Sequence, residues 1–140
     1  IGCKVKSIDY RGVEAADQRV KKLIDACSTI NDPICLVGSS MGGFVASAAA
    51  LDVRAVGLFV LAPAYFMKGF EYTPFEVANI PTEIVHGWHD DIVPVENSIR
   101  FAQQNQSKIH IVNGDHRLTK NIKDINIYLE IFLNQFILDS

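Results

Sequence analysis

The sequence has few of the features that place a chain in a specialised class of protein. Its three cysteines are Cys3, Cys27 and Cys35, an odd number without C-x-x-C spacing, which disfavours a disulfide framework or a zinc site. No apolar run reaches membrane-spanning length, and no segment resembles a signal peptide. The net charge of -3, without a dense basic run, gives no support to nucleic-acid binding. We expect a cytoplasmic protein with reduced thiols, no nucleic-acid partner and no membrane span.

The composition is that of a folded protein with a substantial core. Hydrophobic residues make up 49% of the 140 residues and charged residues 21%, which is typical of soluble globular domains and not of disordered chains. This length fits one domain and leaves no room for a second. Residues 1–140 are therefore predicted to form a single domain.

Apolar runs and helical periodicity alternate along the chain. The apolar runs predict strands at residues 5–10, 34–37, 56–61, 82–86 and 108–112. Helical spacing predicts helices over residues 14–27, 44–51 and 96–104, and a long terminal helix whose apolar stripe is Ile122, Ile125, Leu129, Phe132, Leu133 and Phe136. Most of the strands are apolar on both faces. The pattern therefore predicts an α/β fold, a three-layer α/β/α sandwich around a mostly parallel sheet.

One stretch, residues 36–43, carries the strongest chemical signal. Gly38, Ser40 and Gly42 form a G-x-S-x-G pattern between a predicted strand and a predicted helix, the context of a nucleophile elbow. Glycines on either side would let the backbone approach closely around a strained serine. Ser39 is expected to be structural. A phosphate-binding loop is the alternative reading of a glycine-rich turn, but its lysine is missing here.

Two further side chains follow predicted strand ends. Ser40, Asp90 and His116 occur in this order along the chain, each just after a strand. Because carboxyl ends of parallel strands meet at one edge of a sheet, the three can converge there. His116 has three rivals: His86, expected to be buried and hydrogen-bonded; His89, expected in a loop; and His110, within a strand. A metal site built from these histidines and nearby aspartates is disfavoured, since no H-E-x-x-H or comparable ligand pair is present.

Three motifs together resemble the α/β-hydrolase family, over nearly the whole chain. They are the elbow at residues 38–43, the acid loop His86-Gly87-Trp88-His89-Asp90-Asp91-Ile92-Val93-Pro94, and the loop Gly114-Asp115-His116. The chain looks most similar to small bacterial esterases of the YqiA type, which have a minimal lid. The resemblance implies Ser40 as nucleophile, His116 as base and Asp90 as the acid that orients it, with the Met41 N–H as one oxyanion donor. Asp91 is the alternative acid, although the spacing to Val93 and Pro94 favours Asp90.

The resemblance also implies a part that this sequence does not show. The family takes its second oxyanion donor from a loop after a strand that lies between the strands equivalent to residues 5–10 and 34–37. We expect about 30 further residues upstream, a strand with its crossover helix. The chain as given would then lack its N-terminal strand and oxyanion loop, at a cost of about 10² to 10³ in rate.

The implied activity is hydrolysis of a small carboxylic or thioester through an acyl-Ser40 intermediate, without metal or cofactor. The alternative is a non-catalytic hydrolase-like domain that binds a ligand or partner. Tyr65, Phe66 and Trp88 are the expected substrate-binding residues. The aromatic connection that follows residue 64 either lines an acyl pocket or seals the core; its members are Tyr65, Phe66, Met67, Phe70, Tyr72 and Phe75. The sequence does not indicate the oligomeric state.

Overall fold

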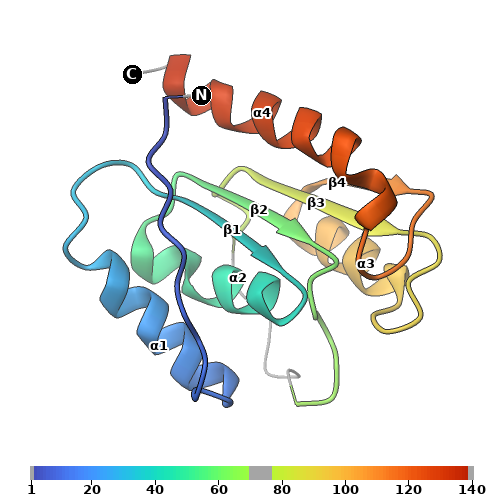
Figure 1. Cartoon of the computed structure of the whole chain (residues 1–140), viewed down its shortest axis with the longest axis horizontal. Coiled ribbons are helices and arrows are strands. Elements are labelled where there is room, and N and C mark those ends of the chain that lie inside the picture. Colours follow the sequence, from blue (N-terminus) through green and yellow to red (C-terminus); the bar gives the residue numbers. More distant parts are fainter. Residues whose placement is uncertain (1, 70–76, 139–140) are drawn as a thin grey trace.

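The computed structural model describes residues 2–69 and 77–138 (Figure 1). Within these residues lie four strands, four α-helices and one short 3-10 helix. In chain order these elements are α1 (Ala16–Cys27), β1 (Cys35–Ser39), α2 (Met41–Val53), β2 (Gly57–Leu61), β3 (Thr82–Gly87), α3 (Val95–Asn105), β4 (Lys108–Val112), η1 (Thr119–Asn121) and α4 (Ile122–Leu138). Phe70, Tyr72 and Phe75, expected at the acyl pocket or the core, lie outside the described residues.

The four strands form one parallel sheet in the order β1-β2-β3-β4. Each strand therefore lies beside its neighbour in the sequence, and the connections through α2 and α3 cross over a face of the sheet. In the register, Val37 pairs with Phe59, and Leu61 pairs with Val85. All four strands thus end at the same edge of the sheet, where the loops after β1, β3 and β4 meet.

Helices cover both faces of this sheet (Figure 1). One face packs against α1, α2 and α3, in a core that includes Leu58 and Val60 of β2. The opposite face packs against α4, in a second core that includes Phe59 of the same strand. Successive side chains of β2 point to opposite faces and are fully buried on both. The predicted three-layer α/β/α architecture with a parallel sheet is confirmed.

The terminal helix α4 follows its predicted apolar stripe with one exception. Ile125 and Phe132 are buried in the second core, and Leu129, Leu133 and Phe136 pack against it. Ile122 was expected in the same stripe, but it is 52% exposed because it is the first residue of α4, directly after η1. Its assignment to the core is therefore wrong.

The prediction of a strand at residues 5–10 is also wrong. This segment forms no strand, and the α1 helix begins at Ala16 rather than at Glu14. Ile8 and Tyr10 are half-buried against the first core, whereas Val5 is 89% exposed. Some of the alternating apolar residues therefore pack against the core, but no neighbouring strand pairs with the segment, as a β-ladder would require.

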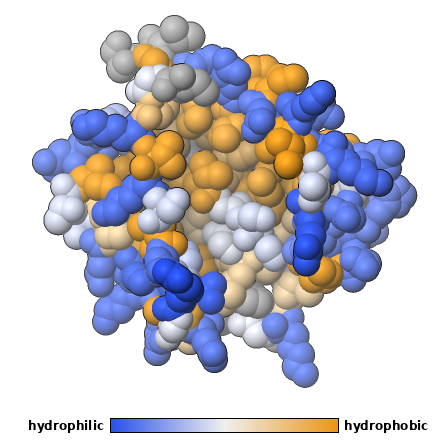
Figure 2. Space-filling view, viewed as in Figure 1, coloured by the Kyte–Doolittle hydropathy of each residue, from blue (hydrophilic) through white to orange (hydrophobic). Residues whose placement is uncertain are grey.

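Strand β1 lies at one edge of the sheet in the described part of the chain. Its one strand neighbour there is β2, and Val37 at its middle is 53% exposed. Figure 2 shows hydrophobic side chains gathered over the middle of this view of the molecule, with hydrophilic ones around the rim. The additional strand expected beside β1 stays a prediction.

No helix within residues 2–69 and 77–138 is long and apolar enough to cross a lipid bilayer.

Candidate active site

Ser40 occupies the turn between β1 and α2 in a strained backbone conformation. Its φ of 54° and ψ of -118° place it at positive φ, which costs a non-glycine residue about 1–3 kcal/mol. Three contacts hold it there. The Ser40 N–H donates to Leu61 O (2.9 Å), and Ser40 O accepts from the amides of Ala64 (2.9 Å) and Gly43 (3.0 Å). The end of β2 therefore fixes the conformation that presents the Ser40 hydroxyl.

The structure brings Ser40, His116 and Asp90 into one hydrogen-bonded chain. Ser40 Oγ lies 3.0 Å from His116 Nε2, and His116 Nδ1 lies 2.7 Å from Asp90 Oδ2. Ser40 and His116 are 76 residues apart in the sequence. The three residues come from the loops after β1, β4 and β3, which end at the same edge of the sheet. This is the convergence that the sequence pattern predicts.

The loops that carry Asp90 and His116 are joined by their backbones. The amides of Trp88 and His89 donate to Val112 O (2.9 Å) and Gly114 O (3.0 Å). Asp115 shapes the second loop from within, because its carboxylate accepts from the amides of Arg117 (3.1 Å) and Leu118 (3.0 Å). The Asp90–His116 pair is therefore held by two cross-linked loops.

The carboxylate of Asp90 is fully buried and has several donors. Its Oδ1 accepts from the amides of Ile92 (2.9 Å) and Val93 (2.8 Å), while Oδ2 faces His116. Burial alone raises the pKa of Asp90. The hydrogen bonds from His116, Val93 and Ile92 outweigh burial, so that the pKa of Asp90 is lowered from its ordinary value. Asp90 is thus an ionised acceptor. The rival Asp91 is exposed, and the carboxylate that bonds His116 Nδ1 is that of Asp90.

The proton positions in the hydrogen-bonded chain of Ser40, His116 and Asp90 follow from which atoms can only accept a hydrogen bond. An ionised carboxylate can only accept, so Nδ1 of His116 carries the proton in the bond to Asp90. Neutral His116 then presents a lone pair on Nε2 to the hydroxyl of Ser40, which donates to it. The arrangement can remove a proton from Ser40 and store it on an imidazolium beside a buried negative charge.

The other histidines have different surroundings. His86 is fully buried and bonds Ser98 Oγ and Val93 O. His110 bonds Glu83 and stacks on the ring of Tyr128, with ring centroids 4.0 Å apart. His89 is exposed in the acid loop. Within the described residues, no group of histidine, cysteine and acidic side chains could hold a metal ion.

The start of α2 points at the site. Met41 is its first residue, so its N–H has no partner within the helix and carries the positive end of the helix dipole. This geometry suits the oxyanion role expected for Met41. The second oxyanion donor, expected from an upstream loop, stays a prediction.

The three expected substrate-binding residues have unequal access to solvent. Tyr65 is fully buried, its hydroxyl lies 2.6 Å from Ser47 Oγ, and its ring stacks on Phe101 at 3.9 Å. Phe66 is half-buried, with the guanidinium of Arg100 3.9 Å from its ring centroid. Trp88 is 57% exposed. In this structure Tyr65 therefore belongs to the core, whereas Phe66 and Trp88 keep solvent-accessible surface.

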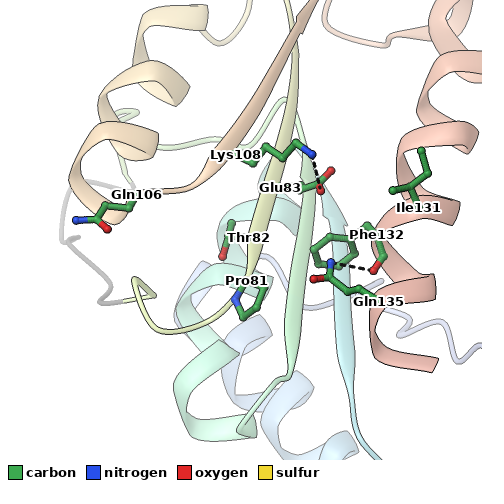
Figure 3. A pocket seen from close by; sticks show the side chains of 8 residues that line it. All are labelled: Pro81, Thr82, Glu83, Gln106, Lys108, Ile131, Phe132 and Gln135. Atoms are coloured by element: carbon green, nitrogen blue, oxygen red, sulfur yellow. Dashed lines mark hydrogen bonds and ion pairs between the residues drawn. The ribbon is translucent and has the colours of Figure 1, made fainter. Parts of the chain in front are cut away.

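A hollow lies elsewhere in the molecule. It has a volume of about 430 Å³ and is lined by residues at the starts of β3 and β4 and by α4, including Thr82, Lys108 and Phe132. Figure 3 shows Glu83 at its wall, paired with Lys108 Nζ at 3.7 Å. Parallel strands begin at the edge opposite to the one that carries Ser40, so this cavity is separate from the site.

Sequence reasoning missed the groups that hold the site in place. The partners of Ser40 are the backbone groups of Leu61 and Ala64, which leave no side-chain signal. The link between His86 and Ser98 joins β3 to α3, and no spacing rule connects the two residues. The one indication of this link in the sequence was the expectation that His86 is buried and hydrogen-bonded.

Comparison with known proteins places these features in a family. The family described as "Alpha/beta hydrolase domain" matches residues 12–127. A search of curated protein sequences gives no match.

Solved structures share the fold. One is a protein from Xanthomonas campestris pv. campestris assigned to the alpha/beta superfamily of hydrolases, with 25% identity, a TM-score of 0.82 and coverage of 93% of this chain and 80% of that one. A second is alpha/beta hydrolase domain-containing protein 10 from mouse, with 19% identity, a TM-score of 0.71 and coverage of 92% and 72%. A third, from Xanthomonas campestris, is described as an α/β serine hydrolase without lid; it has 18% identity, a TM-score of 0.73 and coverage of 97% and 62%. With more than half of its residues matched by the family, the chain belongs to the alpha/beta hydrolases.

Proposed function

We propose that this protein is a serine hydrolase that cleaves carboxylic or thioesters of small molecules through an acyl-Ser40 intermediate. The observation that carries the proposal is the hydrogen-bonded chain from Ser40 Oγ to His116 and from His116 to Asp90. A hydroxyl is a weak nucleophile unless an adjacent base takes its proton, and this chain supplies the base and the group that orients it.

In the first half of the reaction, Ser40 Oγ attacks the ester carbonyl carbon while its proton moves to His116 Nε2. The carbonyl oxygen becomes an oxyanion, which the Met41 N–H and the start of α2 stabilise. The tetrahedral intermediate then collapses and the bond to the leaving alcohol or thiol breaks. His116 returns the proton to the leaving group, and the acyl group remains on Ser40.

In the second half, His116 Nε2 takes a proton from water as the water oxygen attacks the acyl carbon. Collapse of the second intermediate releases the carboxylic acid, and His116 returns the proton to Ser40 Oγ. Asp90 remains ionised throughout and stabilises the imidazolium in both halves. The chemistry of these side chains requires no metal or cofactor.

One structural relative supports an ester substrate. It is described as an esterase from Pyrococcus furiosus and has 19% identity, a TM-score of 0.62 and coverage of 85% and 60%. The relative described as a serine hydrolase without lid supports the serine chemistry. Trp88, within the acid loop, and Phe66, which packs against Arg100 of α3, are the proposed contacts for the substrate, since both retain accessible surface. Tyr65 would contact it only after a rearrangement of the core.

The test is turnover of activated esters, such as 4-nitrophenyl acetate, by the full-length protein. We expect Ser40→Ala to lower the rate to background, a loss on the order of 10⁴-fold or more, with an unchanged circular dichroism spectrum. Ser39→Ala is the matched control and should retain activity, because this neighbouring serine is exposed and the hydroxyl that bonds His116 is that of Ser40. Equal activity of the Ser40→Ala variant would remove Ser40 from the mechanism. Absence of turnover in the full-length parent would favour a ligand-binding domain instead.

A further inference from the structure

A second histidine contacts the carboxylate of Asp90 from inside the protein. His86, at the end of β3, is fully buried. Its Nε2 lies 2.9 Å from Val93 O and 3.0 Å from Asp90 Oδ2, and its Nδ1 lies 2.7 Å from Ser98 Oγ on α3. The oxygen that His86 approaches is the same Oδ2 that faces His116. One carboxylate oxygen thus lies between two imidazole rings.

The partners of His86 define its proton position. Val93 O can only accept, so Nε2 of His86 carries a proton and donates to it. A neutral ring then leaves Nδ1 as an acceptor for the hydroxyl of Ser98, which satisfies both nitrogens. Asp90 Oδ2 also lies 3.0 Å from Nε2, close enough for the partial positive charge of this N–H to act on it electrostatically while the N–H donates to Val93 O.

The surroundings of this contact are closed to solvent. The side chains of His86 and Asp90 are both 0% exposed, so the charge of the carboxylate is poorly screened there. Within the described residues, the ionisable side chains paired with Asp90 are His86 from β3 and His116 from the loop after β4. From α3 the group facing His86 is the neutral hydroxyl of Ser98.

We infer that His86 is a positioning residue for Asp90: its Nε2–H fixes the acid loop through Val93 O and partly neutralises the negative charge on Oδ2 that acts on His116. This inference rests on the proposed function. When His86 changes, Asp90 keeps the Ile92 amide as a donor on Oδ1, whereas its second donor, the Val93 amide, belongs to the segment that His86 holds through Val93 O. Loss of the His86 Nε2–H should therefore change mainly the negative charge of Asp90 that acts on His116, and the order of the loop at Val93.

Two amide substitutions isolate the Nε2–H donor. The amide nitrogen of glutamine reaches the position of Nε2, whereas the shorter asparagine reaches only the position of Nδ1 and can still bond Ser98. We expect His86→Asn to lower kcat about tenfold or more, with KM changed by less than about twofold, as when a group that orients a functional side chain is removed. The acid limb of kcat/KM should move up by about half a pH unit or more, because a less neutralised carboxylate holds the proton on His116 to higher pH. His86→Gln should restore both quantities.

His110→Asn is the matched control, since His110 Nε2 also lies 3.1 Å from a carboxylate, that of Glu83, but away from the site. Circular dichroism and thermal unfolding establish that each variant is folded. If folded His86→Asn and His86→Gln have the same kcat, or if the acid limb of His86→Asn coincides with that of the parent, the inference is overturned.

A measurement that needs no turnover separates this inference from the proposed function. The proton in the His116–Asp90 hydrogen bond gives a far-downfield NMR resonance in such pairs. We expect it to shift or broaden in His86→Asn and to be retained in His86→Gln and His110→Asn. Should the parent lack Ser40-dependent turnover, the proposed function fails, and this resonance still decides the role of His86. An identical resonance in all variants would overturn it.

Discussion

Gly38 and Gly42 touch across the turn that presents Ser40. A Cβ atom on Gly38 would lie 2.2 Å from the carbonyl oxygen of Gly42 and 2.8 Å from the nitrogen of Gly43. A Cβ on Gly42, by contrast, would meet nothing within 4 Å. The close approach of the end of β1 to the start of α2 therefore depends on one of the two glycines in the G-x-S-x-G pattern, although both were expected to serve it.

Alanine at these two positions should have opposite effects on stability. Gly38→Ala should lower the free energy of unfolding by about 2–4 kcal/mol, because backbone atoms must move to admit the methyl group. Gly42→Ala should change it by less than about 1 kcal/mol, in the stabilising direction, because alanine favours the helix that Gly42 occupies. Urea denaturation of both variants measures the difference. Equal destabilisation by the two substitutions would contradict this account of the turn.

Acid should weaken the fold partly through Asp90. Its pKa is lower in the folded protein than the ordinary value of 3.8, so the ionised form contributes stability above that value. The contribution is lost as pH falls through the lowered pKa of the folded state. We expect the difference in unfolding free energy between the parent and Asp90→Asn to be constant above about pH 5 and to shrink at lower pH.

Chemical denaturation across this pH range measures that difference. Asp91→Asn is the control, since Asp91 is exposed and a surface substitution typically changes stability by less than about 0.5 kcal/mol. A difference for Asp90→Asn that grows as the pH falls would have the wrong sign.

Two of the three free cysteines, Cys3 and Cys35, should react with alkylating agents in a defined order. Burial raises the pKa of Cys35 to about 11, with a smaller contribution from Cys3, so Cys35 has little thiolate at neutral pH. Cys3 is exposed. Iodoacetamide at pH 7.5 should therefore modify Cys3 before Cys35, as peptide mass spectrometry would show. Labelling in urea removes the effect of burial, and preferential labelling of Cys35 in the folded protein would contradict the prediction.

Much of the sheet could be predicted from the sequence because its signals are local. The four runs that form β1, β2, β3 and β4 are short, apolar and bounded by turns. The convergence of Ser40, Asp90 and His116 followed from the strand ends alone, because a parallel sheet brings those ends to one edge.

The remaining features depend on tertiary contacts that the sequence does not encode locally. Residues 5–10 alternate like a strand, but a strand also needs a partner, and none pairs with them in the described part of the chain. Tyr65 has the same aromatic character as Phe66, yet stacking on Phe101 and contact with Ser47 place it in the core. The contact between His86 and Asp90 depends on how the acid loop folds, which the sequence alone does not specify.

The central claim is that Ser40 is a nucleophile activated by His116. The most direct measurement is intact-protein and peptide mass spectrometry of the full-length protein after treatment with a fluorophosphonate. The account predicts one covalent adduct, mapped to Ser40, with labelling that is strongly slowed in His116→Ala and unaffected in Ser39→Ala. An absence of adduct, or an adduct on another residue while Ser40 stays unmodified, would contradict it.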